Sequence, residues 1–350
     1  MKRKVAILGA TGAVGQRFIQ LLHEHPWFQI DVLAASERSA GKKYKDACSW
    51  LMETELPKEI AELPVVNADV DSVEQAGTVD MVFSSLPGEL AGSVEAQFGA
   101  LYPVFSKASA FRMAKDVPLI IPEINPDHTE LVKIQQKLRG WKGFITTDPN
   151  CSTIQLAITL KPLMRFGLKQ VVVSTMQALS GAGYPGVPSL DIIDNVIPFI
   201  SSEEEKMETE ALKILGKYNG HTVQNADFQL SASCNRVHVI NGHLESVFIK
   251  LEQDPTMAEI EEAFTKFQGE PQNLKLPSAP INPIVVRHEK NRPQPRFDRD
   301  TGNGMSIVVG RIRKDPLMTF KYMCLGHNTV RGAAGGGILS AELYASKGLV

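Results

Sequence analysis

The sequence has 350 residues, which is long enough for two domains with separate cores. Hydrophobic residues make up 43% and charged residues 22%, and the formal net charge of −2 argues against a nucleic acid or a membrane surface as the main partner. No stretch approaches the roughly 18 apolar residues of a membrane span. The cysteines lack the spacing of a zinc site or a disulfide framework, so we expect no metal and a reducing, cytoplasmic location: Cys48, Cys151, Cys234 and Cys324.

The N-terminal segment has the order strand, glycine turn, helix. Val5–Leu8 is a short apolar run, Gly9–Gly15 follows with the sequence GATGAVG, and apolar residues then recur at helical spacing from Val14. This order predicts a dinucleotide-binding turn, in which glycines permit a tight bend and the helix N-terminus receives a pyrophosphate. Because the spacing is GxxGxxG instead of GxGxxG, a plain loop is the alternative.

The second predicted strand, Ile30–Ala35, ends at a short polar segment that bears on the choice of cofactor. Small hydroxyls beside an arginine suit the 2′-phosphate of NADP, whereas a carboxylate here would bind the ribose of NAD. Ser36, Arg38 and Ser39 therefore favour NADP, and Glu37 argues against it. A solvated turn is the other interpretation.

Short apolar runs then alternate with helical stretches. We predict strands within Val79–Ser85, at Pro103–Ser106 and at Pro118–Ile121. This alternation implies a parallel sheet wound with right-handed crossovers. Arg112 lies in the loop between the last two of these strands, where it could bind an anion or simply face solvent.

The most informative stretch combines a strand, a turn and the start of a helix. Phe144–Thr147 predicts the strand, Asp148–Asn150 the turn, and the apolar residues that follow a buried helix. Asn150 or Ser152 would cap that helix, which leaves Cys151 at its N-terminus, where backbone N–H groups favour a thiolate. Cys151 is thus a candidate nucleophile, although a small buried apolar residue is the more common role of a free cysteine.

The next part of the chain supplies a second glycine-rich loop and a helix. The predicted strand Val171–Gln177 leads into Ser180–Gly186, where backbone could closely approach a ligand. Ser202 and Glu205 form a capping-box signature for the helix after it. On its own, a carboxylate and an amine on that helix say little about function: Glu210 and Lys213.

Asn241-Gly242 between two β-type runs is the strongest two-residue signal for a hairpin and predicts one over residues 236–249. Its register would bring polar side chains to one face, which could hold a carboxylate substrate and a proton shuttle or could simply face solvent. The hairpin does not say which histidine matters. The side chains concerned are Arg236, His238, His243 and Glu245.

The C-terminal part begins with residues 271–300, which are rich in proline and charge. Acidic residues interrupt the basic ones, so this segment predicts a solvated loop instead of a nucleic-acid surface. A strand is predicted at Met305–Ile312. The small residues of His327–Leu339 begin a final helix, which we expect to pack back on the first domain beside the cofactor.

Together these motifs resemble aspartate-β-semialdehyde dehydrogenases, most closely the branch found in archaea and fungi. The resemblance covers essentially the whole chain, including GATGAVGQRF, FSKASAFRM, TDPNCSTIQLAITLKPL, MQALSGAGYPGVPS, SASCNRVHVINGHLES and HNTVRGAAGGG. It implies an α/β protein: a Rossmann-type parallel-sheet NADP domain (residues 1–149, completed by 327–350) and an α+β catalytic and dimerisation domain (150–326). It also implies a homodimer or homotetramer.

The resemblance implies four catalytic positions: the nucleophile Cys151, the general acid/base His243, and Asn150 and Gln177 around them. Cys151 would attack the acyl carbon of L-aspartyl-4-phosphate, giving a thioester and expelling phosphate. NADPH would reduce the thioester to L-aspartate 4-semialdehyde, and His243 would protonate the oxyanion or the leaving sulfur. The product would serve the biosynthesis of lysine, diaminopimelate, threonine, methionine and isoleucine.

Further positions match substrate and cofactor contacts of this family. Arg236 would bind the substrate α-carboxylate, and Glu210 would face its amino group. Arg112 and Lys213 would hold the phosphate. The positions that match NADP contacts are Gly9, Thr11, Gly12, Ala13, Val14, Ser36, Arg38, Ser39, Ser85, Ser180, Gly181, Ala182, Gly183 and Asn328.

Three other functions remain open at this point. Malonyl-CoA reductase has the same overall build, but the flank of its cysteine differs, whereas Pro149–Thr153 matches the dehydrogenase form. N-acetyl-glutamyl-phosphate reductase shares the chemistry and fits the motifs less well. From another class, a non-catalytic NADP-binding redox sensor would keep the glycine turn but would not need Cys151, His243 and Arg236 together.

Overall fold

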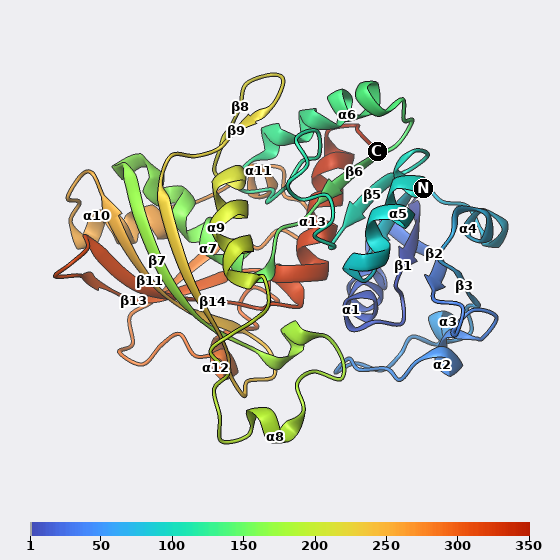
Figure 1. Cartoon of the computed structure of the whole chain (residues 1–350), viewed down its shortest axis with the longest axis horizontal. Helices are drawn as coiled ribbons and strands as arrows, with labels where there is room; N and C mark the ends of the chain where they lie inside the picture. Colours follow the sequence, from blue (N-terminus) through green and yellow to red (C-terminus); the bar gives the residue numbers. More distant parts are fainter. Residues whose placement is uncertain (1) are drawn as a thin grey trace.

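The computed structural model describes residues 2–350, in which two six-stranded sheets form the centres of two lobes (Figure 1). A ribbon of two short strands, β8 (Lys217–Tyr218) and β9 (Val223–Gln224), projects from the lobe of the second sheet. The strands of the first sheet are β1 (Arg3–Leu8), β2 (Phe28–Ala35), β3 (Val65–Asn67), β4 (Met81–Ser84), β5 (Pro103–Ser106) and β6 (Phe144–Thr147). Those of the second are β7 (Leu168–Gln177), β10 (Gln229–Arg236), β11 (His243–Leu251), β12 (Ile284–Arg287), β13 (Ile307–Lys314) and β14 (Phe320–Gly326).

The helices cover these sheets and connect their strands. Short 3-10 helices at Pro126–Glu130, Lys161–Phe166 and Leu179–Ala182, and a π-helical turn at Val330–Ala334, complete the regular structure. The helices of the first lobe are α1 (Ala13–Leu22), α2 (Tyr44–Ala47), α3 (Lys58–Ala61), α4 (Val70–Ala76), α5 (Gly88–Gly99), α6 (Leu131–Arg139) and the C-terminal α13 (Gly335–Ser346). The others are α7 (Cys151–Leu160), α8 (Ser189–Ile192), α9 (Glu203–Ile214), α10 (Met257–Thr265), α11 (Glu270–Asn273) and α12 (Pro295–Asp298).

The first sheet is wholly parallel, with the strand order β3-β2-β1-β4-β5-β6. Its strands are apolar on both faces because helices cover both: Val5 and Ile7 of β1 pack toward α1 and α13, and Ala6 and Leu8 toward α4 and α5. This confirms the doubly wound architecture. The carboxyl ends of parallel strands lie at one edge, and the order reverses between β1 and β4, which is where such sheets bind ligands.

The second sheet is mixed, with the order β10-β7-β11-β14-β13-β12. Helices α7, α9 and α10 cover one face and bury the largest apolar cluster of the described residues. Along β7 and β11, buried residues alternate with partly exposed ones, so the opposite face remains open. We call this surface the open sheet face; its central side chains are Val172, Ser174, Met176, Leu244, Ser246 and Phe248.

The C-terminal helix returns to the first sheet, as predicted (Figure 1). Ser340 of α13 donates to Asp148 at 3.0 Å, and the hydroxyl of Tyr344 lies 3.0 Å from that of Thr146. Helix α13 therefore packs against the first lobe. No helix within residues 2–350 is both long enough and apolar enough to cross a membrane.

The predicted hairpin over residues 236–249 is wrong. Strand β7 lies between β10 and β11 and pairs with both, parallel to the first and antiparallel to the second. Residues 237–242 cross over the end of β7, where Leu179 donates to Val239 and Ser180 to Ile240. The Asn241-Gly242 signal thus marks a bend, with φ +98° at Gly242, instead of a hairpin turn.

Two smaller predictions also need correction. Pro118–Ile121 is a buried loop with a single bridge from Leu119 to Thr147 and not a full strand. Ser202 precedes α9, but its left-handed backbone (φ 57°) differs from the extended conformation of a helix cap, and its hydroxyl makes no capping hydrogen bond. The capping box with Glu205 is therefore absent from this helix.

Candidate active site

Cys151 is the first residue of α7, directly after the turn that follows β6. The side chain of Asn150 caps the helix by accepting from the N–H groups of Ser152 at 3.0 Å and Thr153 at 3.2 Å. Of the two caps that the sequence allowed, Asn150 is therefore the one used. An added Cβ at Gly332 would lie 2.8 Å from Cβ of Cys151, so the glycine lets the π-helical turn approach the cysteine closely.

His243, the first residue of β11, meets this cysteine. Its Nε2 lies 3.2 Å from Sγ of Cys151, although 92 residues separate the two in the chain. Burial, with the nearby Glu203 carboxylate, raises the pKa of Cys151 to about 12, while Arg112 and Arg236 act against this rise. Burial and Arg236 lower the pKa of His243 to about 3. Both groups are thus neutral near pH 7, and burial outweighs the expected helix-terminus effect on the thiol.

Arg236 and Gln177 join the pair from the neighbouring strands. Arg236 of β10 lies opposite Gln177 of β7. Leu244 of β11 lies opposite Met176 of β7, so the preceding residue of β11, His243, lies level with Gln177 on its other side. Arg236 donates to the carbonyl of Ala178 at 2.7 Å. Oε1 of Gln177 is buried, and no other described residue offers it a hydrogen bond. Three of the four side chains predicted to share a polar face, Arg236, His243 and Glu245, therefore do so, and β7 lies between the two strands that carry them.

Glu245 lies on that face behind His243, whereas His238 does not belong to the site. Glu245 is fully buried, and Sγ of Cys324 donates to it at 3.4 Å. His238 is exposed on the segment that crosses over β7. The structure thus distinguishes the two histidines, which the sequence alone could not.

Arg112 and Glu210 form a buried ion pair below the cysteine turn. Nη1 of Arg112 donates to Oε1 of Glu210 at 2.9 Å, and the backbone N–H of Asn150 donates to Oε2 at 2.6 Å. Arg112 also donates to the carbonyl of Lys107 at 2.7 Å. This network connects α9 to the loop after β5 and to the N-terminus of α7.

Lys213 lies one turn along α9 from Glu210 and is also buried. Its ammonium donates to three backbone carbonyls, those of Arg112, Ala114 and Val117, at 2.7 to 2.8 Å. Burial lowers its pKa to about 8, against the effects of Asp116 and Glu210. Lys213 therefore holds the loop that carries Arg112.

Two charged residues near the cysteine were not singled out from the sequence. Glu203, the first residue of α9, accepts from Nδ2 of Asn150 at 2.6 Å. Lys107, after β5, lies 3.1 Å from Asp148, and both side chains are buried. Each residue lies at the end of a helix or strand, which is only a weak sign of a functional site in a sequence. Their partners, Asn150 and Asp148, are more than forty residues away, so the sequence did not reveal the contacts.

A cavity of about 420 Å³ lies at the carboxyl ends of β1 to β4, at the point where the strand order reverses. Gly9 has φ +75°, and an added Cβ would lie 2.8 Å from the carbonyl oxygen of Ser85. A Cβ at Gly15 would lie 2.2 Å from the carbonyl oxygen of Gly9, so this glycine permits close packing of helix on strand. The predicted cofactor positions that line the cavity are Gly9, Thr11, Gly12, Ser36 and Ser85.

The other predicted cofactor positions lie outside that lining. Arg38 is exposed and Ser39 buried after β2, and Ala13 and Val14 form the first turn of α1. Gly181 lies beside His243, since its added Cβ would lie 3.1 Å from Cε1 of the ring. The loop Ser180–Gly183, which also contains Ala182, therefore lies beside His243 and Arg236.

Asn328 ties this loop to the turn before His243. Its Nδ2 donates to the hydroxyl of Ser180 at 2.8 Å, and its Oδ1 accepts from the N–H of Gly242 at 2.8 Å. A side chain from the C-terminal segment therefore holds two parts of the second lobe together beside His243.

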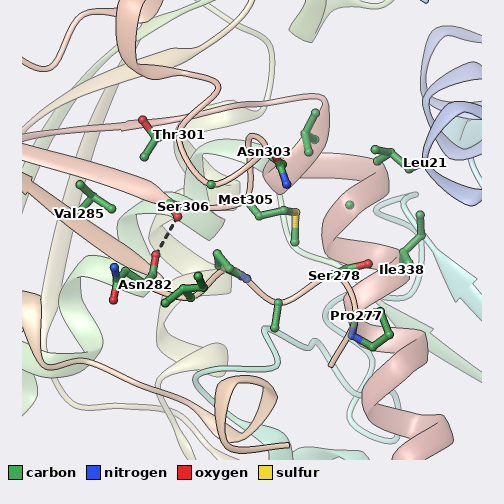
Figure 2. Close-up of a pocket in the computed structure, with 16 residues that line it drawn as sticks. Leu21, Pro277, Ser278, Asn282, Val285, Thr301, Asn303, Met305, Ser306 and Ile338 are labelled. Carbon is green, nitrogen blue, oxygen red and sulfur yellow. Dashed lines mark hydrogen bonds between the residues drawn. The ribbon is translucent and has the colours of Figure 1, made fainter. Parts of the chain in front are cut away.

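A separate cavity of about 500 Å³ lies between the lobes (Figure 2). Leu21 and Ile338 face the segments around Ser278 and Met305, and Ser306 donates to the carbonyl of Asn282 at 2.7 Å. No ionisable side chain belongs to its described lining. This cavity therefore offers no acid–base chemistry. Among residues 2–350, likewise, no three histidine, cysteine or carboxylate side chains are grouped to hold a metal.

Each of the two lobes matches the model of a known protein family. Residues 4–132 match the family model "Semialdehyde dehydrogenase, NAD binding domain", and residues 160–331 match "Semialdehyde dehydrogenase, dimerisation domain". An aspartate-semialdehyde dehydrogenase of Archaeoglobus fulgidus is 54% identical over 100% of both chains. A malonyl-CoA reductase (NADP) of Metallosphaera sedula is 42% identical over 99% of this chain and 98% of its own.

Solved structures give the same result. The crystal structure of aspartate-semialdehyde dehydrogenase with NADP from Candida albicans has a TM-score of 0.91 and 41% identity over 100% of both chains. Among relatives compared by sequence alone, an aspartate-semialdehyde dehydrogenase of Schizosaccharomyces pombe is 46% identical over 99% of each chain. With full-length similarity and both family models matched, this chain belongs to the aspartate-semialdehyde dehydrogenase family.

Proposed function

We propose that this protein is an NADP-dependent aspartate-semialdehyde dehydrogenase, which converts L-aspartyl-4-phosphate to L-aspartate 4-semialdehyde in the biosynthesis of aspartate-family amino acids. The observation that carries the proposal is the contact of 3.2 Å between Sγ of Cys151 and Nε2 of His243, with Arg236 and Gln177 on the adjoining strands. A nucleophile, a titratable ring and a guanidinium in one buried row suit acyl transfer from an anionic substrate.

The cavity at the glycine turn fits a dinucleotide. Gly12 lies at the N-terminus of α1, and its added Cβ would have only one neighbour within 4 Å, at 3.4 Å, so a pyrophosphate can approach the backbone. Ser36 and Arg38, beyond β2, suit the 2′-phosphate of NADP, and Glu37 also lies there. When bound, NADPH supplies the hydride that reduces the thioester.

The residues of the chain would divide the remaining work as follows. Cys151 attacks the acyl carbon and carries the thioester, which replaces one difficult step by two easier ones. His243 hydrogen-bonds the sulfur and the oxyanion that forms beside it. Arg236 orients the substrate α-carboxylate, and Arg112 with Glu210 positions the phosphate and the amino group.

Cys151→Ala tests this function. The variant should lose phosphate-dependent oxidation of aspartate semialdehyde while it still binds NADPH, because the glycine-turn cavity remains intact. Gly92→Ala is a control on α5, where the new Cβ would lie 3.9 Å from Cβ of Ala110 and cause no clash. Substantial turnover by the Cys151 variant would refute the role of the thiol.

Substrate assays separate the alternatives. Wild-type protein should reduce aspartyl phosphate far faster than malonyl-CoA, the substrate class named for the Metallosphaera sedula relative. A protein that binds NADPH but turns over neither substrate would favour the redox-sensor alternative. These assays need only the purified chain.

The open sheet face supports a homodimer, which could pair further into a tetramer. Val172 is 43% exposed and lies among half-buried apolar side chains on β7 and β11, including Met176, Leu244 and Phe248. Such contiguous apolar surface usually marks an interface. A soluble dimer of this kind would act in the cytoplasm, where the half-buried thiol of Cys151 stays reduced.

A further inference from the structure

The π-helical turn Val330–Ala334 lies between the helix that follows the glycine turn and the helix that begins at the cysteine. It packs against both α1 and α7. An added Cβ at Gly332 would lie 2.8 Å from Cβ of Cys151 and 3.2 Å from its Cα, so the turn touches the cysteine along its backbone. Because protein interiors are close-packed, a shift of this turn would move Cys151 relative to α1.

Hydrogen bonds within the turn define its shape but not its position in the protein. The N–H of Gly332 donates to the carbonyl of His327 at 3.0 Å, and that of Ala334 donates to Thr329 at 3.3 Å, which is the five-residue spacing of a π-helix. At Ala333 the backbone leaves helical angles, with φ −143° and ψ −110°, before α13 begins. Single π-helical turns are frequent at functional sites. The position of this turn has to be set by contacts from outside it.

Arg331 fixes the turn to a distant part of the chain. Its Nη1 donates to Oε1 of Glu123 at 2.9 Å and its Nη2 to Oε2 at 2.6 Å, although 208 positions separate the two residues. Arg331 is 2% exposed and Glu123 4% exposed, so water cannot replace either partner. Two parallel hydrogen bonds between a guanidinium and a carboxylate set a direction as well as a distance. The pair therefore fixes the turn relative to the loop that carries Glu123.

The loop that carries Glu123 is bound to the strand that leads to the cysteine. The N–H of Ile120 donates at 2.9 Å to the carbonyl of Thr147, the last residue of β6. Asn125 closes the loop, because its Oδ1 accepts from the N–H of Ile121 at 2.9 Å. The ion pair therefore clamps the π-helical turn against the same strand from which the cysteine turn starts.

We propose that Arg331 and Glu123 are positioning residues for the reaction, and that their ion pair holds the π-helical turn against Cys151 and α1. The inference rests on the function proposed above and adds two residues to its machinery. Both act through the backbone of Gly332 and not by touching the substrate. Loss of the pair should therefore change the placement of the thiol while the ligand-binding side chains remain.

Arg331→Lys is the first test. A lysine keeps the positive charge opposite Glu123 but cannot make two parallel hydrogen bonds to it. We expect kcat to fall by roughly tenfold or more, since a displacement near 1 Å costs about a hundredfold. KM for aspartate semialdehyde and for NADP should stay close to the wild-type values, because neither residue contacts a ligand. A wild-type kcat in this variant would overturn the proposal.

A second arginine–carboxylate pair provides the matched control. Nε and Nη2 of Arg292 both donate to the carboxylate of Asp298, within the proline-rich segment of the second lobe. Arg292→Lys removes the same two-pronged geometry at a place that does not hold the π-helical turn. Its kcat should therefore equal that of the wild type.

The double variant Arg331→Met with Glu123→Met separates positioning from stability. Removing one partner leaves a buried charge unpaired, whereas two apolar side chains remove both charges and can restore stability. Methionine is flexible and sets no direction. We expect the melting temperature of the double variant to return toward the wild-type value while kcat stays roughly tenfold or more below it. Recovery of kcat together with the melting temperature would show that the pair only stabilises the fold, against the proposal.

Thiol alkylation gives a readout that needs neither substrate nor cofactor. Iodoacetamide should modify Cys151 several times faster in Arg331→Lys than in the wild type, because the turn no longer packs firmly on the cysteine. Cys48, the other half-buried cysteine, is the internal reference and should react at the same rate in both proteins. Peptide mass spectrometry measures each rate, and an unchanged rate at Cys151 would contradict the positioning role. A wild-type protein without dehydrogenase activity would instead refute the proposed function and leave the alkylation result standing.

Discussion

The backbone N–H of Asn150 donates a hydrogen bond of 2.6 Å to the carboxylate of Glu210. The same carboxylate accepts from Arg112 at 2.9 Å, so a single buried group links α9, the loop after β5 and the residue that caps the cysteine helix. The position of Cys151 therefore depends on a carboxylate that is about sixty residues away along the chain. Stability and activity should respond together when this pair is broken.

Glu210→Ala is expected to lower the free energy of unfolding by roughly 3–5 kcal/mol, because the charge of Arg112 would stay buried without its partner. The double variant with Arg112→Ala should lose less than the sum of the two single losses. Urea denaturation of the four proteins measures this coupling. Simple additivity would mean that the two side chains do not stabilise each other.

Gly332→Ala should reduce kcat by roughly 100-fold, the effect expected of a displacement near 1 Å in an active site. The new Cβ would lie 2.8 Å from Cβ of Cys151 and would push the cysteine away from His243. NADPH affinity, measured by fluorescence titration, should remain unchanged. Gly92→Ala serves as the control, and a fully active Gly332 variant would contradict the close packing at Cys151.

The sequence predicted those features of the site that depend on neighbouring residues, and it missed those that depend on residues far apart in the chain. The glycine turn was predictable, and the helix cap was narrowed to Asn150 or Ser152, because neighbouring residues determine such features. The partners of β11 were not, since the Asn241-Gly242 signal is local and the insertion of β7 between β10 and β11 is a tertiary event.

Side-chain contacts between residues far apart in the chain were likewise not predictable from the sequence. The Glu210–Lys213 pair was uninformative in the sequence because Lys213 binds carbonyls about a hundred residues away, among them that of Arg112. The thiolate expected at Cys151 from the helix terminus is not the form that the structure favours, because packing of both lobes buries the thiol and raises its pKa. Only the family resemblance pointed to Arg112, Glu210 and Lys213 as site residues in advance.

Glu245→Gln should change the pH dependence of stability. Burial raises the pKa of Glu245 to about 8, so between its unfolded value near 4.5 and pH 8 the unfolded chain is ionised and the folded protein is not. Wild-type stability should therefore fall across this window relative to the glutamine variant, by up to about 1.4 kcal/mol for each pH unit. Urea unfolding at several pH values between 5 and 8 measures the difference. Parallel curves for the two proteins would show that Glu245 is ionised in the folded state.

Arg38→Ala should raise KM for NADPH by roughly ten- to a hundredfold, since it removes a charge-assisted hydrogen bond to the 2′-phosphate. KM for NADH should change little, because NADH has no group at that position. Arg38 is exposed, so stability should be unaffected. Steady-state kinetics with both cofactors check this, and equal effects on the two would remove Arg38 from the phosphate site.

Val172→Glu on the open sheet face should convert the oligomer to a monomer, because a carboxylate at the centre of an apolar interface would be buried without a partner. Val172 is 43% exposed within this chain and pairs across the sheet with Phe248, so the substitution leaves the core intact. Leu138→Glu, at a position 71% exposed on α6 of the other lobe, is the matched control and should keep the wild-type mass. Light scattering after size-exclusion chromatography measures each mass. If the Val172 variant and the wild type had the same oligomeric mass, subunits would have to meet through a different surface.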